Sequence, residues 1–155
     1  MVTIEINKKQ LWQNYRDAFF YASWIYIGLM LIGAAVGAVG LVLGIGKDVY
    51  TLTLGIAATV MGGLAFFMVV FQMITLHIVF FGKFKENYPN GVKRFELGRS
   101  ESGFEIHNLI NGASATLHFY NVVKVAKTKN TILIKLKRGT LIGFPRNEEL
   151  DKVFY

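Results

Sequence analysis

Two long segments without charged side chains limit what this chain can fold into. The first extends from Ala18 to Gly46 and the second from Val49 to Gly82, with a short polar link between them. A helix needs about 20 apolar residues to cross the hydrocarbon core of a bilayer, so each segment is long enough to span it. In a chain of 155 residues, the part outside these two segments is too small to cover two such helices on every side in a soluble core. We therefore expect a membrane protein with spans at about 20–45 and 50–80.

Basic residues around these segments predict the topology. The link between the two segments consists of Lys47 and Asp48, with Gly46 before them and Val49 after them. Because the link is so short, the helices must form an antiparallel hairpin. Lys and Arg accumulate on the cytoplasmic side of membrane helices. They flank both outer ends of the hairpin here: Lys8, Lys9 and Arg16 before it, and Lys83, Lys85, Lys93 and Arg94 after it. Both termini are thus expected in the cytoplasm, in an inner or plasma membrane.

The first apolar run is much longer than the core of a signal peptide, which has about 7–15 residues, so it is interpreted as a retained span. Before it, Asn7 and Gln10 have the spacing of a helix-capping box. The helix that starts there either lies along the membrane surface or extends the first span. We divide the chain into an N-terminal strand and interfacial helix (1–16), a transmembrane hairpin (17–88) and a cytoplasmic β domain (89–155).

Small residues recur on one face of each span. Glycine permits close approach of helices in lipid, where no hydrophobic force acts between them. These faces either pack against each other within one hairpin or mediate homodimerisation. Three polar residues of the second span, Gln72, Thr75 and His77, are interpreted as packing and hydrogen-bonding positions, because neither span contains a charged partner. The predicted packing residues are Gly33, Gly37, Gly40 and Gly44 in the first span, and Gly55, Thr59, Gly62 and Gly63 in the second.

After residue 91 the apolar period changes from helical to two. Alternation is clearest where Ile132, Ile134 and Leu136 oppose Thr131, Leu133, Lys135 and Lys137. Turn residues separate five or six such strands, which predicts an antiparallel sheet, sandwich or partly open barrel and hence an α+β chain. A terminal helix is expected from Glu148. Val2–Ile6 is a further candidate strand, and if it joins the sheet, the hairpin is an insertion within one split domain.

A short motif in this region resembles a known family. The run Phe119-Tyr-Asn-Val122-Val-Lys-Val125, then Thr128-Lys-Asn, and then Phe144-Pro145-Arg146, is similar to the YcxB-like family of bacterial membrane proteins. The resemblance implies two transmembrane helices and a small domain related to pleckstrin-homology folds. It does not imply a particular reaction. Phe119 stands where the family has a characteristic Trp, and the other motif positions are Val122, Val125, Pro145 and Arg146.

The sequence offers no reaction chemistry. Cysteine is absent, which excludes thiol nucleophiles, disulfides and thiolate metal sites. No P-loop, dinucleotide fingerprint or nucleophile elbow occurs. His107 and His118 lack a third ligand for zinc, and Glu101 and Glu105 lack partners that would separate their pKa values. We expect no enzyme, no metal and no cofactor.

The most informative charge pattern is the region between Ile106 and Asn147, which contains no acidic residue. Its basic residues suggest binding to anionic lipid headgroups or to a protein partner, since each is worth about 1 kcal/mol near a cytoplasmic leaflet. A solvated face that follows the positive-inside rule is the other reading. An oligomeric transporter or channel subunit is the alternative function, and nucleic acid is not expected. The candidate binding residues are Lys124, Lys127, Lys129, Lys135, Lys137 and Arg138.

Overall fold

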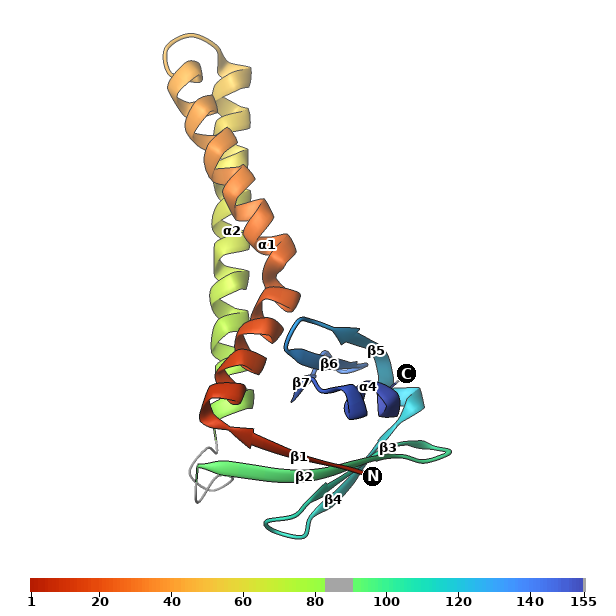
Figure 1. Ribbon diagram of the computed structural model, residues 1–155. Coiled ribbons are helices and arrows are strands. Elements are labelled where there is room, and N and C mark those ends of the chain that lie inside the picture. Colours follow the sequence, from red (N-terminus) through yellow and green to blue (C-terminus); the bar gives the residue numbers. More distant parts are fainter. Residues whose placement is uncertain (83–90, 155) are drawn as a thin grey trace. The chain divides into compact units, whose positions relative to one another are not determined.

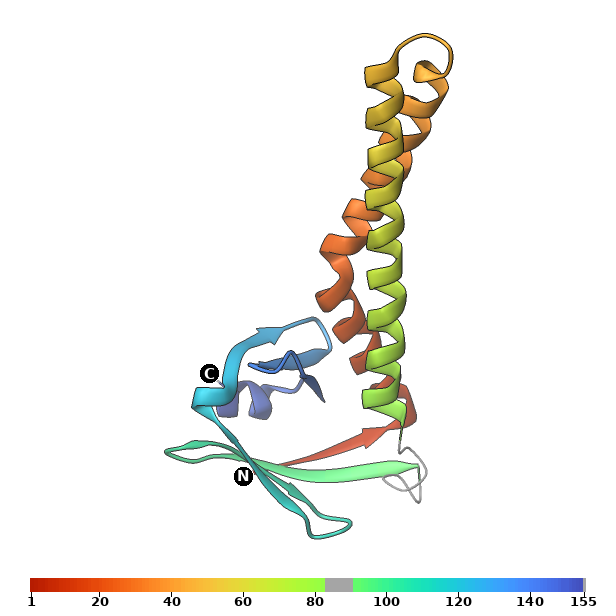
Figure 2. The same cartoon turned by 180° about the vertical axis from the view of Figure 1, so that it is seen from behind.

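The computed structural model describes residues 1–82 and 91–154, seen from two sides in Figures 1 and 2. The chain is α+β, with two long apolar helices and two small antiparallel sheets, as predicted. It divides into two compact units: Phe19–Thr75, and Met1–Ala18 together with Leu76–Tyr155. The first part of the chain thus shares a unit with the C-terminal strands. Lys83 and Lys85, which support the predicted topology, and the predicted domain start at residue 89 lie outside the described residues.

The two uncharged segments form the helices α1 (Lys8–Gly44) and α2 (Val49–Phe81). The predicted capping box at the start of α1 is confirmed. The backbone N–H of Asn7 donates to Gln10 Oε1, and the backbone N–H of Gln10 donates to Asn7 Oδ1, each over 2.9 Å. α1 continues without interruption from this cap, so residues 8–16 extend the first long helix. Asp48 caps α2 with its side chain, since its Oδ2 accepts the backbone N–H of Thr51 over 3.0 Å.

Small residues bring the two helices of the unit Phe19–Thr75 into backbone contact. A Cβ added to Gly33 would lie 2.6 Å from Gly62 Cα, and one added to Gly40 would lie 2.6 Å from Gly55 Cα. The neighbouring contacts of Gly37 with Thr59 and of Gly44 with Leu52 continue the same line. Seven of the eight predicted packing residues therefore meet within one hairpin.

Gly63 is the exception among these packing residues. It is exposed, and a Cβ added to it would find no atom within 4 Å. The reason is geometric, since one residue along a helix of 3.6 residues per turn rotates the side chain by about 100°. Gly62 already occupies the face that meets α1, so Gly63 points away from it.

The first sheet is a four-stranded antiparallel meander of β1 (Val2–Asn7), β2 (Val92–Arg99), β3 (Gly103–Asn108) and β4 (Ser114–His118). β1 pairs with β2 over its whole length, with Val2 opposite Leu97 and Asn7 opposite Val92. Figure 1 shows these two strands side by side. The N-terminal candidate strand therefore joins the sheet, and both long helices are inserted between two neighbouring strands.

The second sheet contains β5 (Val122–Lys127), β6 (Thr131–Leu136) and β7 (Leu141–Pro145) in that order. A 3-10 turn, η1 (Phe119–Asn121), leads into it from β4, and the terminal helix α4 (Glu148–Phe154) follows β7. Residues of both sheets, α1 and α4 form one core, which includes Ile4, Leu97, Phe104, Ile132, Phe144 and Leu150. β4 ends at His118, because Phe119 begins η1.

The start of α1 covers the face of the second sheet that carries Thr131 and Leu133, which we call its outer face. Thr131 Oγ1 donates to Asn14 Oδ1 over 3.0 Å, and Asn14 Nδ2 donates to the carbonyl of Gly143 over 3.3 Å. Thr131 and Leu133 are only 0% and 1% exposed. The alternation predicted correctly that they share a face, but α1 makes that face a second buried surface.

Candidate functional site

The candidate site begins with two lysines that stand opposite each other on β5 and β6. Lys124 and Lys135 are register partners, and both are exposed. Directly opposed side chains on antiparallel strands have Cβ atoms about 4.5–5.5 Å apart, where like charges destabilise the pair. Lys135 follows Leu133 two residues along β6, so the pair lies on the outer face of the second sheet. This pair concentrates positive charge that an external anion would stabilise.

The turns at both ends of these strands add three exposed cations. Lys129 lies in the turn between β5 and β6, and Lys137 and Arg138 lie in the turn between β6 and β7. Gly139 completes the second turn with φ of 78°. Within residues 1–82 and 91–154, no ion pair joins any of these five cations to a carboxylate. We define the basic face as Lys124, Lys129, Lys135, Lys137 and Arg138.

Lys127 is different from the other predicted binding residues. Its Nζ lies 3.5 Å from Asp151 Oδ2 on α4, and Arg146 Nη2 lies 2.9 Å from the same oxygen. The hydrogen bond from Arg146 holds the pKa of the Asp151 carboxyl below its usual value. Arg146 Nη1 also donates to the carbonyl of Thr128 over 3.2 Å. Lys127 and the motif residue Arg146 therefore help to fix α4 to the second sheet, and we leave Lys127 out of the basic face.

Exposed apolar side chains adjoin the basic face and were not predicted as site residues. Tyr120 is 66% exposed and Val123 57% exposed. The Tyr120 ring stacks on His118 with a centroid separation of 5.1 Å. The backbone N–H of Lys137 donates to the carbonyl of Asn121 over 2.9 Å, which joins the turn of the basic face to η1. The adjacent aromatic residues Phe119 and Tyr120 can be seen in the sequence. The exposed position of Val123 cannot, because it depends on a register shift between Val122 and Lys124.

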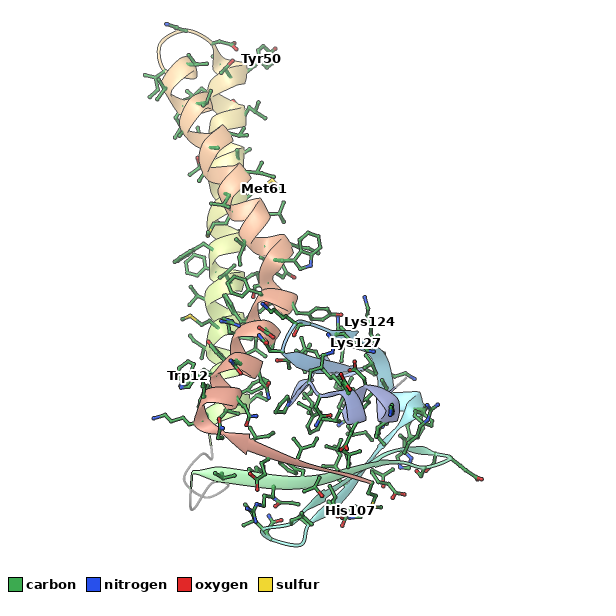
Figure 3. The ribbon with its side chains drawn as sticks, in the orientation of Figure 1. Trp12, Tyr50, Met61, His107, Lys124 and Lys127 are labelled. Carbon is green, nitrogen blue, oxygen red and sulfur yellow. The ribbon has the colours of Figure 1, made fainter. Side chains whose placement is uncertain are left out.

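Comparison of the chain with protein-family models, curated proteins and solved structures finds no match. Function must therefore be inferred from the residues themselves. Figure 3 labels Lys124 and Lys127, which come from one strand.

The motif positions have mostly structural surroundings. Phe119 is 37% exposed, with its ring edge against the buried Phe104 at 5.1 Å and the guanidinium of Arg99 5.5 Å from its centre. Val122 and Val125 pack partly against the core. Pro145 pairs with Thr131 at the end of β7. Phe119 is thus a half-covered aromatic at the sheet junction.

The histidines and glutamates singled out in the sequence lie in separate contacts on the sheets. His107 Nδ1 lies 2.7 Å from Ser114 Oγ, and its Nε2 lies 3.9 Å from Glu105. His118 stacks on Tyr120, and Glu101 is exposed. No group of three metal-binding side chains occurs in the part of the chain that the structure describes.

The three polar residues of α2 lie in three different environments. Gln72 Oε1 accepts a hydrogen bond of 2.6 Å from the buried Ser23, which links the two helices. His77 stacks on Phe81 at 4.9 Å and lies 6.3 Å from Trp12, in an aromatic cluster at the end of α2. Thr75 is exposed. Ser23 was not singled out in the sequence, because a serine among apolar residues gives no hint of its partner.

Proposed function

We propose that the protein is a non-enzymatic integral membrane protein. In this proposal α1 and α2 cross an inner or plasma membrane, both termini are cytoplasmic, and the basic face binds anionic lipid headgroups. The observation that carries the lipid proposal is the facing pair Lys124 and Lys135, extended by three further cations and bordered by Tyr120. A surface that combines positive charge with an exposed aromatic suits the headgroup region of a membrane.

The exposure of the helices supports the membrane assignment. Both are long and apolar enough to cross a bilayer, yet only 22% of the most apolar stretch of α1 and 11% of that of α2 are buried. A core helix of a soluble protein would be mostly covered. Soluble monomers rarely expose apolar patches larger than a few hundred Å². Lipid is the solvent that such side chains require.

A contact near the start of the first span supports the proximity of the basic face to the membrane. Thr128 Oγ1 donates to Asp17 Oδ2 over 2.6 Å. Asp17 is the last charged residue before the uncharged segment that begins at Ala18. The turn that carries Lys129 is therefore next to the point at which the chain would enter lipid. The field of an anionic leaflet acts over a Debye length of about 8 Å, so such a position matters.

The β domain has features that agree with the small domain that the YcxB-like resemblance implies. A four-stranded and a three-stranded antiparallel sheet with a C-terminal helix is an arrangement that suits a domain related to pleckstrin-homology folds. We include this relationship in the proposal. The domain would act by adhesion and positioning, with no bond made or broken.

The glycine contacts favour an anchor over the alternative of an oligomeric channel or transporter subunit. Gly33, Gly40 and Gly55 already meet backbone atoms of the other helix in the same hairpin. The face that would have mediated assembly into a pore is thus occupied within one chain. A homo-oligomer or another membrane protein would have to use a different surface.

The lipid proposal is tested on the full chain, because a fragment starting at residue 89 would lack β1. The chain has no cysteine, so a fluorophore at Val123→Cys reports specifically on this region. We would reconstitute it in nanodiscs with increasing phosphatidylglycerol and measure quenching by headgroup-labelled lipid. Quenching should rise with anionic lipid and fall with salt.

The decisive comparison is between two variants with the same loss of charge. Lys124→Gln with Lys135→Gln should shift the docking equilibrium by roughly 30-fold, since each lysine contributes about 1 kcal/mol. Lys8→Gln with Lys9→Gln, two exposed lysines at the start of α1, should have little effect. Equal effects of both pairs, or quenching that ignores anionic lipid, would contradict lipid binding by this face.

The membrane topology is tested by labelling single cysteines in intact cells. Cysteine at Lys47 should react with an impermeant reagent from outside, and cysteine at Lys129 only after permeabilisation. The opposite pattern would show that the orientation is inverted. Labelling of both positions without permeabilisation would contradict a cytoplasmic β domain.

A further inference from the structure

The first sheet ends in β4, and the far side of this strand is open. In the sheet order β1-β2-β3-β4, β4 pairs with β3, and no other strand of residues 1–82 and 91–154 joins it. Ser114, Ala115 and Thr116 are all exposed. β4 therefore presents a row of backbone groups with which another strand can pair.

The hydrogen bonds at the two ends of the β3 and β4 pair show which residues face outward. The backbone N–H of Asn108 donates to the carbonyl of Ala113 over 2.8 Å. At the other end, the backbone N–H of Phe119 donates to the carbonyl of Ser102 over 3.0 Å. Every second residue between them bonds to β3, because hydrogen-bonded and non-hydrogen-bonded pairs alternate along an antiparallel ladder. The residues whose N–H and C=O groups point to the far side of β4 are Ser114, Thr116 and His118.

The other edges of the two sheets carry features that oppose pairing with a further strand. β1 carries Glu5, β5 carries Lys124 together with a register shift, and β7 ends in Pro145. Charges, bulges and prolines are the features with which proteins protect edge strands. β4 has none of them, since its sequence Ser-Ala-Thr-Leu-His contains no Lys, Arg, Asp, Glu or Pro and its register with β3 is regular. This edge is thus suited to a strand partner.

The sequence of β4 is complementary to itself. Two antiparallel copies of β4 that exchange their outward groups place Thr116 opposite Thr116, and Ser114 opposite His118. On the other face of the strands, the exposed Ala115 then lies opposite Leu117, which packs partly against the core. Threonine pairs and apolar pairs stabilise neighbouring strands, and no like charges meet in this register. A second copy of this chain therefore fits the edge.

We propose that β4 pairs with β4 of a second copy, which joins the two four-stranded sheets into one continuous sheet. The contact has two-fold symmetry, the commonest symmetry of protein dimers. The outward residues of the two strands exchange about six backbone hydrogen bonds, which is few for a dimer that must form from dilute solution. Anchoring of both chains in one membrane, which rests on the function proposed above, raises their local concentration. The glycine face, occupied within one hairpin, takes no part in this contact.

The test uses the full chain in isolated membranes of expressing cells. The chain has no cysteine, so each introduced thiol reports alone. In the proposed register the Cα atoms of the two Thr116 residues are about 5.5 Å apart, within the range of a disulfide. Those of the two Ser114 residues are about 14 Å apart, beyond that range. Mild oxidation should therefore crosslink Thr116→Cys at least about tenfold faster than the matched control Ser114→Cys.

Two combinations of variants check the register and separate pairing from folding. Ser114→Cys expressed together with His118→Cys should give mixed dimers, because the proposed register places these positions opposite each other. Adding Thr116→Lys to both chains should reduce this crosslinking about fivefold, since two like charges then meet across the strands. Thr116 is exposed, so the circular dichroism spectrum should be unchanged.

Three results would overturn the proposal: no disulfide dimer of Thr116→Cys, equal crosslinking of Thr116→Cys and Ser114→Cys, or mixed dimers that form equally well with Thr116→Lys. Crosslinking of Thr116→Cys only to a different protein would also overturn it, because the edge would then bind another partner. Quenching by lipid at Val123→Cys does not depend on these outcomes, so lipid binding by the basic face is decided separately.

Discussion

The contact between Gly40 on α1 and Gly55 on α2 provides the sharpest test of the helix packing. A Cβ at Gly40 would lie 2.6 Å from Gly55 Cα, which is 0.8 Å less than the 3.4 Å at which ordinary contact begins. The obstructing atom is backbone, so no side chain can rotate away. Gly40→Ala must therefore push the helices apart and weaken the neighbouring contact at Gly37.

Gly28→Ala is the matched control on the same helix. A Cβ at Gly28 would meet nothing within 4 Å. Both substitutions gain the same helix propensity, about 1 kcal/mol for glycine to alanine, so that gain cancels between them. Overpacking costs about 1–3 kcal/mol. Gly40→Ala should thus be less stable than Gly28→Ala by about 1–3 kcal/mol.

The stability of the hairpin can be measured by energy transfer between two dyes while SDS replaces a mild detergent. Cysteines at Phe20 and Ile74, both exposed, would carry the dyes without competing thiols. The transition of Gly40→Ala should occur at lower SDS than those of the parent and of Gly28→Ala. Identical transitions for the two alanine variants would refute the close packing at Gly40.

Three further predictions concern polar contacts. Ser23→Ala should destabilise the hairpin by about 0.6–2 kcal/mol in the same SDS titration, and Ser23→Ala should cost little when Gln72 is already leucine. Asn14→Ala should lower the free energy of unfolding of the β domain by about 1–3 kcal/mol in chemical denaturation, since it leaves buried polar partners unsatisfied. Because the folded pKa of Asp151 is depressed by Arg146, its stabilisation is present above the unfolded pKa of about 3.9 and is lost as pH falls through the lower folded value. Asp151→Asn should therefore flatten this part of the thermal stability profile between pH 5 and 2, and an unchanged profile would contradict the assignment.

Local patterns were sufficient to predict most elements of this fold. The uncharged runs predicted α1 and α2, because a helix of that length and composition has few alternatives. The reciprocal side chains of Asn7 and Gln10 predicted the start of α1. Alternation predicted most strands and put Ile132 and Ile134 on one face of their strand, and the structure shows that this face lies in the core. All of these signals act between residues that are close in the chain.

The composition of the candidate site depended on contacts between distant parts of the chain. The sequence grouped Lys127 with the other lysines, but Asp151 on α4 partly balances its charge. A register shift after Val122 helps to expose Val123 beside Lys124. Neither effect leaves a local signal, because the first needs a partner from another element and the second depends on the strand opposite.

The sequence by itself determined that the chain has two long apolar helices, a set of short strands and a basic region without acidic residues. Tertiary structure decided that β1 completes the first sheet, that Asn14 covers Thr131, and that Lys93 stands at an apolar cavity. The physical reason is that periodicity assigns each residue to a face of its own element. Side chains from elsewhere in the chain decide what covers that face. These contacts determine which basic residues form the basic face and where the apolar cavity lies.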